Sequence, residues 1–209
     1  MIALTLAKEV VMNEWESAIE TSRKTGSEEI LGSTSKNTLL NFWQWAYSDI
    51  VGNTERGSLA EYLVALACNI DQKVRVSWDS YDLEFPNGVK IEVKSSAYLQ
   101  SWKQKEYSKP IFGIRKTKSW DYIENLYREE IKRQADVYVF ALLSHKQMET
   151  LNPLDTSRWE FYILKTELID HEMKDRKQIS LEKIKELNAL KSSFSELKDN
   201  ILGLVQGKQ

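Results

Sequence analysis

The sequence predicts an α/β fold in which a central mixed β-sheet is flanked by helices, and several patterns support this prediction. Apolar and polar residues alternate on both sides of a turn at residues 85–88, which is typical of an antiparallel hairpin. Residues 137–143 are nearly all apolar, as in a strand that is covered on both faces. Residues 37–50 and 55–69 place apolar residues at helical spacing, whereas residues 159–163 alternate again. We therefore expect a sheet of about five strands, a usual size.

The length and composition suit one folded domain. Of the 209 residues, 42% are hydrophobic and 29% are charged, so the chain can bury a sizeable core. We expect a single domain over residues 1–209, with an N-terminal helical addition at 1–52, the core at 53–165 and C-terminal helices at 166–209.

Few cysteine and histidine residues restrict the kinds of site that the chain can build. One cysteine allows neither an internal disulfide nor a cysteine cage, and two histidines argue against a zinc site. No apolar run is long enough to cross a membrane, and residues 1–9 are too short and too soon charged for a signal peptide. We therefore expect a soluble, cytoplasmic protein.

The hairpin at residues 78–96 carries an unusual polar face. Its turn contains a proline, which fixes φ, and Asn87-Gly88, which tolerates positive φ. Across two paired strands the alternation then brings together Asp82, Glu92 and Lys94. Two carboxylates make an oxygen site for a divalent cation, and Lys94 can reach a water or phosphate held there. The alternative is an ordinary charged face of an exposed hairpin.

Glu61 lies on the helix predicted at residues 55–69. The apolar residues of this helix form a stripe, and Glu61 stands on the other side among small or apolar neighbours. The stripe consists of Leu59, Tyr62, Leu63, Leu66 and Ile70. A buried carboxylate needs a partner, which is either a metal site or a nearby lysine or arginine.

Glu61, then Asp82, then Ile91-Glu92-Val93-Lys94 resemble, on helix, strand and strand, the motif of the PD-(D/E)xK nuclease superfamily. The aspartate follows Tyr81 where that motif has proline. The resemblance covers residues 55 to about 104 well and 136–164 in outline. It implies a restriction-endonuclease-like fold and a metal-dependent DNA endonuclease of the restriction, repair or defence type.

The resemblance also implies a role for each residue of the motif. Asp82 and Glu92 would bind Mg²⁺ directly, with Mn²⁺ as a substitute, and Glu61 would bind a second ion or a metal-bound water. Lys94 would orient or deprotonate the attacking water, or stabilise the developing charge.

Three further side chains are secondary candidates. In some branches of the superfamily a glutamine after the lysine strand supports the site, so Gln100 is one, although it equally suits a plain surface residue. Glu84 and Asp79 are reserve carboxylates. Glu84 shares the face of Asp82, whereas Asp79 is expected on the opposite face.

The basic segment, residues 90–118, carries eight basic and two acidic side chains although the whole chain has a net charge of −2. Its aromatic residues are interleaved with the charges, an arrangement that suits a phosphate backbone. A solvated loop and helix surface is the alternative. The expected DNA contacts are Lys103, Lys105, Lys109, Arg115 and Lys116.

The other segments give predictions of secondary structure. We expect a first strand near residues 74–77 and a short helix capped by Thr166, and we place the aromatic cluster Phe42–Trp45 in the core. The remaining helices are expected at residues 4–24, 97–106 and 121–134 and from Ser180 onward as one long final helix.

Alternatives remain open for function and assembly. A structure-specific nuclease such as a junction resolvase shares the chemistry, and a non-catalytic nucleic-acid-binding domain shares the fold. Cutting both strands of a duplex usually takes two sites related by a two-fold axis, which suggests a homodimer. The apolar positions of residues 187–204 suit either a seam between two copies or packing on the chain's own core.

Overall fold

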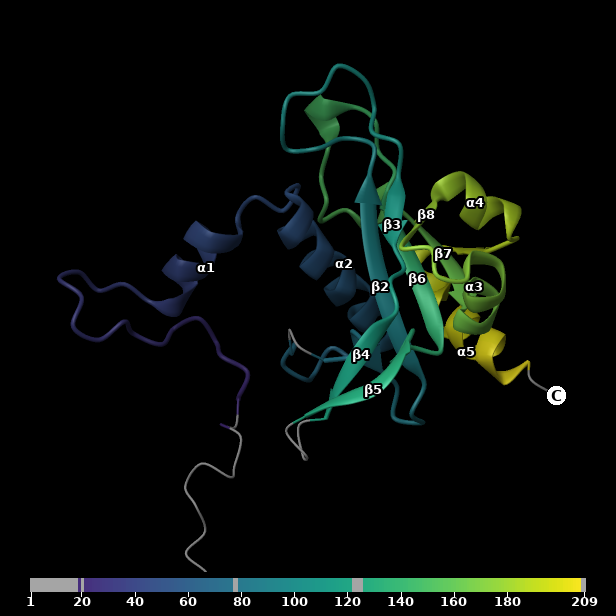
Figure 1. The fold of residues 1–209 in the computed structure, drawn as a ribbon. Coiled ribbons are helices and arrows are strands. Elements are labelled where there is room, and N and C mark those ends of the chain that lie inside the picture. The colour runs from purple at the N-terminus through teal and green to yellow at the C-terminus, as the bar shows by residue number, and fades with distance from the viewer. Residues whose placement is uncertain (1–18, 20, 77–78, 122–125, 208–209) are drawn as a thin grey trace, which may run out of the picture.

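The computed structural model describes residues 19, 21–76, 79–121 and 126–207. Its centre is a five-stranded sheet with the order β1-β2-β6-β7-β9 (Figure 1). The parallel neighbours are β2 and β6, and the other pairs are antiparallel, which confirms a mixed sheet. The five strands are β1 (Leu83–Glu84), β2 (Lys90–Ala97), β6 (Val137–Leu143), β7 (Trp159–Lys165) and β9 (Leu190–Ser192).

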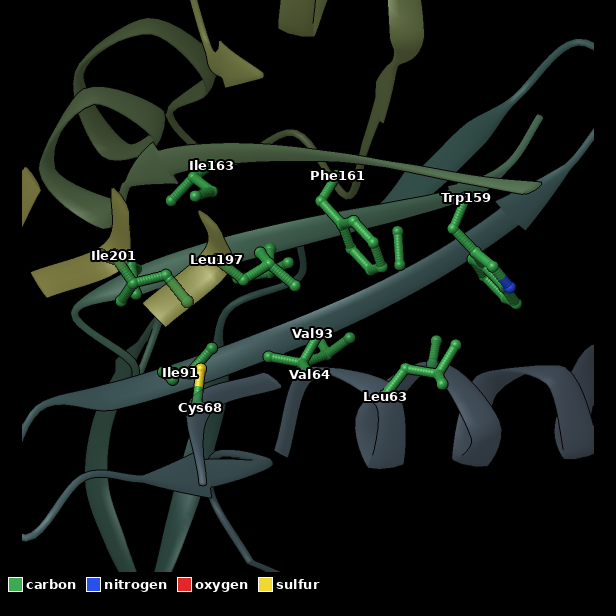
Figure 2. Packing of buried hydrophobic residues seen from close by; sticks show 14 of the residues in the cluster. Leu63, Val64, Cys68, Ile91, Val93, Trp159, Phe161, Ile163, Leu197 and Ile201 are labelled. Atoms are coloured by element: carbon green, nitrogen blue, oxygen red, sulfur yellow. The ribbon is translucent and has the colours of Figure 1, made fainter. Parts of the chain in front are cut away.

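One face of the sheet is covered by α2 (Asn53–Cys68) and α5 (Leu197–Gln206). Figure 2 shows Leu63, Val64 and Cys68 of α2 pointing toward Ile91 and Val93 of β2. Residues of β7 and α5 belong to the same core, and the same view labels Trp159, Phe161, Ile163, Leu197 and Ile201.

The other face is covered by α3 (Thr166–Met173), α4 (Leu181–Glu186) and a small sheet. That sheet pairs β3 (Ile111–Gly113) with β8 (Gln178–Ser180). Helices on both faces of the mixed sheet confirm the α/β prediction, and they explain why all seven residues of β6 are buried. Three short 3₁₀ turns complete the fold: η1 (Met148–Thr150), η2 (Thr156–Arg158) and η3 (Phe194–Glu196).

The predicted hairpin at residues 78–96 is present as β1 and β2. The amide of Phe85 donates to the carbonyl of Val89, and Gly88 adopts φ +85° in the turn. The first strand is shorter than expected, because residues 74–76 are not part of any strand and residue 77 lies outside the described residues.

A second hairpin, which we call the arm, replaces the helix predicted at residues 121–134. It consists of β4 (Thr117–Asp121) and β5 (Leu126–Lys132), which form a two-stranded sheet separate from the central one. The helical prediction is wrong because the apolar spacing matched a helix by chance, whereas Trp120 pairs with Tyr127 across two strands.

The N-terminal region differs from its prediction. α1 (Leu39–Tyr47) lies apart from the sheet in Figure 1, and none of its residues is buried. The placement of Phe42–Trp45 in the core is therefore wrong, and the Trp45 side chain is 84% exposed. Helical spacing identifies an apolar stripe but not what covers it. Most of the helix predicted at residues 4–24 lies outside the described residues, and residues 21–24 are not helical.

Two further helix predictions are wrong. After β2, the Gln104 side chain accepts a hydrogen bond from the amide of Gln100 at 2.7 Å, in place of a helix at residues 97–106. The long final helix is broken where Asn188 adopts φ +54°, although Ser180 caps α4 as expected. β9 follows as an edge strand, and Leu197 and Ile201 of α5 pack on the chain's own core. The homodimer stays an untested prediction.

Within the part of the chain that the structure describes, none of the helices has the length and apolar character needed to cross a membrane.

Candidate functional site

Three polar side chains of the first hairpin lie together. The Lys94 ammonium is 2.5 Å from Glu92 Oε1 and 3.7 Å from Asp82 Oδ2. The side chains of Asp82 and Glu92, which we call the acidic pair, are 20% and 18% exposed. A lysine between two half-buried carboxylates is the arrangement that the alternation predicted.

The backbone of the hairpin fixes the acidic pair in place. Asp82 directly precedes β1, and its amide donates to the carbonyl of Ile91 at 3.1 Å. The amide of Val93 donates in return to Asp82 Oδ2 at 2.7 Å. Because Ile91 and Val93 are buried under α2, the intervening Glu92 must point to the opposite face, toward its register partner Tyr138.

Burial dominates the electrostatics of the pair. The pKa of Asp82 is raised to about 7, mainly by desolvation and also by repulsion from Glu92 and Glu61, against the opposing attraction of Lys94. Burial alone would lower the pKa of Lys94, but the charges of Asp82 and Glu92 outweigh it and the net shift is upward. The arrangement thus holds one firmly charged cation beside a carboxylate that resists ionisation.

A hollow of about 550 Å³, which we call the acidic hollow, opens beside the pair. Asp82 and Glu92 line one part of it, and the arm contributes Lys118, Trp120 and Tyr127. The remaining lining residues are Thr117, which also belongs to the arm, and Asp79 and Ser80. The volume lies within the range of about 300–1,000 Å³ that small-molecule sites usually have.

Glu61 is bound by an arginine. The Arg75 guanidinium contacts both carboxylate oxygens of Glu61, with Nη2 donating to Oε1 at 2.9 Å and Nε donating to Oε2. These hydrogen bonds raise the pKa of Arg75. The pairing with a nearby basic residue was one of the two alternatives for Glu61. A second hollow of about 210 Å³ is lined by both Glu61 and Asp82, so this carboxylate still shares a space with one member of the acidic pair.

The donor set suits a magnesium ion only in part. Two carboxylates with waters or substrate phosphates are a usual way for proteins to hold Mg²⁺, so Asp82 and Glu92 fit this ion. Among the described residues, however, no group of three or more Asp, Glu, His or Cys side chains is placed to hold a metal ion. The structure therefore brings two of the three expected ligands together and leaves Glu61 with Arg75.

Gln100 is held at the end of β2 by a buried arginine. The Arg56 guanidinium, on a residue only 3% exposed, donates to Gln100 Oε1 at 3.1 Å and to Ser95 Oγ at 3.2 Å. Two more bonds go to the carbonyl of Val51 and to Asn53 Oδ1. Gln100 is thus a fixed, half-buried side chain near the strand that carries Lys94, and not a plain surface glutamine.

The reserve carboxylates Asp79 and Glu84 each line a hollow that Asp82 also lines. Asp79 lines the acidic hollow together with Asp82 and Glu92. Glu84 is exposed, lines the second hollow and accepts a hydrogen bond from the hydroxyl of Tyr81 at 2.7 Å. The expectation that Asp79 faces away assumed a regular strand through residue 79, whereas β1 begins only at Leu83.

The basic segment is divided between two places. Lys103, Lys105 and Lys109 lie on the loop that follows β2, at the upper end of the sheet in Figure 1. Arg115 is exposed between β3 and β4, and Lys116 binds Asp175 at 2.9 Å. Lys118, which was not among the expected DNA contacts, is the basic residue of this segment that lines the acidic hollow.

Some side chains of the site were not found from the sequence. Arg75 lies 14 positions from Glu61, and the described residues between the end of α2 and Arg75 form no helix or strand that would predict the contact. Tyr127 was expected within the helix at residues 121–134, and no element was expected at Trp120, so neither ring was expected in the site. Arg56 lacks a sequence signal, because an arginine near a helix start usually faces solvent.

Comparison with known proteins adds one finding. A sequence model of the family described as bacteriophage T4 endonuclease IV matches residues 5–183. A search of curated proteins finds no match for the chain. The matched stretch contains the acidic pair, Lys94, Glu61 and the arm, and it supports a nuclease. The PD-(D/E)xK relationship remains a resemblance of motif.

Proposed function

Since the chain belongs to the bacteriophage T4 endonuclease IV family, we propose that it is a divalent-metal-dependent DNA endonuclease that hydrolyses phosphodiester bonds at the acidic pair. The observation that carries this proposal is the position of Lys94 between Asp82 and Glu92, two carboxylates that line a hollow open to solvent. A charged surface without function would not need two half-buried carboxylates around one lysine.

Each residue has a task that follows from its chemistry. Asp82 and Glu92 would hold Mg²⁺, which when bound supplies charge neutralisation at the phosphate and lowers the pKa of a water. Lys94 would donate hydrogen bonds to a phosphate oxygen, and its positive charge would stabilise the additional negative charge of the transition state. Asp82 and Lys94 are oriented before substrate arrives, because Val93 and Glu92 bind them. Glu61 would assist once Arg75 no longer occupies its oxygens.

The test is a plasmid nicking assay with Mg²⁺ or Mn²⁺, together with calorimetric titration of the ion. Asp82→Asn and Glu92→Gln each remove one negative charge from the ion site, so both should abolish nicking and weaken ion binding. Glu160→Gln is a matched control, since Glu160 is also a strand carboxylate paired with a lysine, Lys191, at 2.9 Å. It should nick at the wild-type rate.

Two results would contradict the proposal. A wild-type protein that binds no divalent ion has no metal site at the acidic pair. Equal nicking by wild type and Glu92→Gln would show that the chemistry lies elsewhere.

A further inference from the structure

The arm brings two aromatic side chains to the acidic hollow. Trp120 and Tyr127 line it together with Asp82 and Glu92, although they come from different hairpins. Their rings lie edge to face, with centroids 4.8 Å apart and planes at 68°. The side chains that would hold a phosphate and a pair of aromatic rings thus share one space.

The contact between the Trp120 and Tyr127 rings helps to hold the two strands of the arm together. Trp120 and Tyr127 are register partners, and a cross-strand aromatic pair stabilises two strands. A two-stranded hairpin by itself is nevertheless only marginally stable in water. Every residue of β5 is exposed, so this strand has no side chain covered by the body of the protein.

The exposed rings indicate that the arm is covered when the protein works. Trp120 and Tyr127 are 38% and 57% exposed, and Leu126 and Ile131 on the same arm are exposed as well. Exposed apolar side chains gathered on a projecting element usually mark a binding surface. The occupant must suit an aromatic wall, a lysine and an acidic pair that prefers a cation.

A nucleotide unit of DNA has the matching chemistry. Its phosphate needs a cation and a lysine, which the acidic pair and Lys94 would provide, and Lys118 lines the same hollow. Its base has a flat π-face, which stacks on tryptophan and tyrosine rings. Peptides and sugars lack this combination of a phosphodiester and a flat ring system held one sugar unit apart.

We propose that Trp120 and Tyr127 form a stacking surface for one nucleobase next to the phosphodiester bound at the acidic pair. The proposal rests on the proposed function and deepens it by assigning the arm to substrate positioning. Stacking tolerates every base, because each has a π-face, so the arm contributes affinity and placement without fixing a sequence.

Paired removal of ring and base tests this contact. A short DNA oligonucleotide is used in whichever form, single-stranded or duplex, the enzyme cuts faster, and the cut is mapped. A series of oligonucleotides is then prepared, each of which lacks a single base at a different position beside the cut. For the wild-type enzyme, loss of the stacked base should lower kcat/KM roughly tenfold, within the range that base–aromatic stacking contributes. Trp120→Leu and Tyr127→Leu should be slower on the intact oligonucleotide and should lose nothing further when that base is missing.

Two variants separate stacking from a general need for the arm. Trp120→Phe keeps a ring and should retain most of the dependence on the base. Ile131→Ala changes an exposed residue of the arm that does not line the acidic hollow. This variant should retain the full dependence of kcat/KM on the base.

The outcomes distinguish this proposal from the proposed function. A wild-type enzyme that cuts DNA, with base dependence undiminished in both leucine variants, would overturn the stacking contact alone. Loss of the base dependence in Trp120→Phe or Ile131→Ala would also overturn the stacking contact. The effect would then come from any disturbance of the arm and not from the loss of a ring. A wild-type protein that cuts no DNA would overturn both proposals.

Discussion

The two hairpins of the chain differ in what supports them. β2 of the first hairpin lies inside the central sheet, with Ile91 and Val93 buried beneath α2 and β6 alongside. The strands of the arm form a separate two-stranded sheet, and β5 has no buried residue among those described. The first hairpin carries the acidic pair and Lys94, and the arm carries exposed aromatic rings.

This difference separates two requirements of a nuclease site. Groups that act on a phosphodiester must be held within a fraction of an ångström, which a strand buried in a sheet achieves. Groups that hold a long polymer gain from adaptability, and weakly supported elements provide it. The comparison predicts that changes at the first hairpin alter folding and rate, whereas changes at the arm alter binding.

The largest effect is expected from removing the support of β2. Phe140 on β6 is fully buried, is the register partner of Lys94, and has its ring centroid 5.2 Å from that of Phe112. Phe140→Ala should lower the free energy of unfolding by about 3–5 kcal/mol, because it deletes buried apolar surface and leaves a cavity. Urea denaturation measures this change.

The arm supplies the matched comparison. Ile131 is 59% exposed, and Ile131→Ala should change the free energy of unfolding by no more than about 0.5 kcal/mol. A loss of similar size for both variants would mean that the arm is as well supported as the sheet, and the contrast between the hairpins would not hold.

The same contrast explains which elements could be predicted from sequence. β6 and β7 are covered on both faces and β2 mainly on the face of Ile91 and Val93, so their burial appears in the sequence as apolar runs or as alternation. The arm and α1 lack such cover, and their apolar residues matched helical spacing without indicating a partner. The break at Asn188 escaped prediction, because β9 exists only through pairing with β7, which no local pattern reveals.

The second largest effect concerns the reaction rate. Lys94→Ala should lower kcat by about 10²–10³-fold, the loss typical when one charge-stabilising donor is removed from a reaction site. Its affinity for Mg²⁺ should stay the same or rise, since a positive charge 2.5 Å from Glu92 repels the ion. Single-turnover cleavage and calorimetry measure the two quantities separately. Weaker ion binding with an unchanged rate would assign Lys94 a structural role.

For the site, sequence reasoning succeeded where strand periodicity fixes geometry. Asp82, Glu92 and Lys94 meet because period two places them on one face of a hairpin. It could not find Arg75, whose contact with Glu61 depends on the path of the chain between α2 and β1. That contact requires tertiary structure, which spacing does not encode.

A third effect is expected in the pH dependence of stability without metal. The pKa of Asp82 is raised to about 7 in the folded protein from an ordinary value of 3.8, so the native state binds the proton more tightly than the unfolded chain. This contribution to stability is present below the unfolded pKa and is lost as the pH rises through the folded pKa. Between about pH 4 and pH 7, wild type should therefore lose about 1–2 kcal/mol relative to Asp82→Asn, a value reduced for residual solvent contact.

Glu160→Gln provides the opposite sign as a control. Burial would raise the pKa of Glu160, but hydrogen bonds from Tyr162 and Lys191 outweigh it and the net shift is downward. Its contribution is present above the unfolded pKa and is lost as the pH falls. Denaturation in a chelating buffer across this range compares the three proteins. Parallel curves for wild type and Asp82→Asn would show that Asp82 is solvated and ordinarily acidic.

The smallest effect sharpens the comparison at the edge of the first hairpin, where Arg75 contacts Glu61 through both carboxylate oxygens. Arg75→Ala removes a positive charge and leaves the carboxylate of Glu61 facing the hollow that it shares with Asp82. The site becomes more negative, so Mn²⁺ should bind roughly tenfold more tightly, about 1.4 kcal/mol.

Arg158→Ala is the matched control. Arg158 binds Asp155 at 3.0 Å next to the end of β6 that lies away from Glu61, so this substitution should leave the affinity for Mn²⁺ unchanged. Equal Mn²⁺ affinity of Arg75→Ala and wild type in calorimetry would mean that Glu61 takes no part in ion binding, and that its arginine only ties α2 to the chain leading into β1.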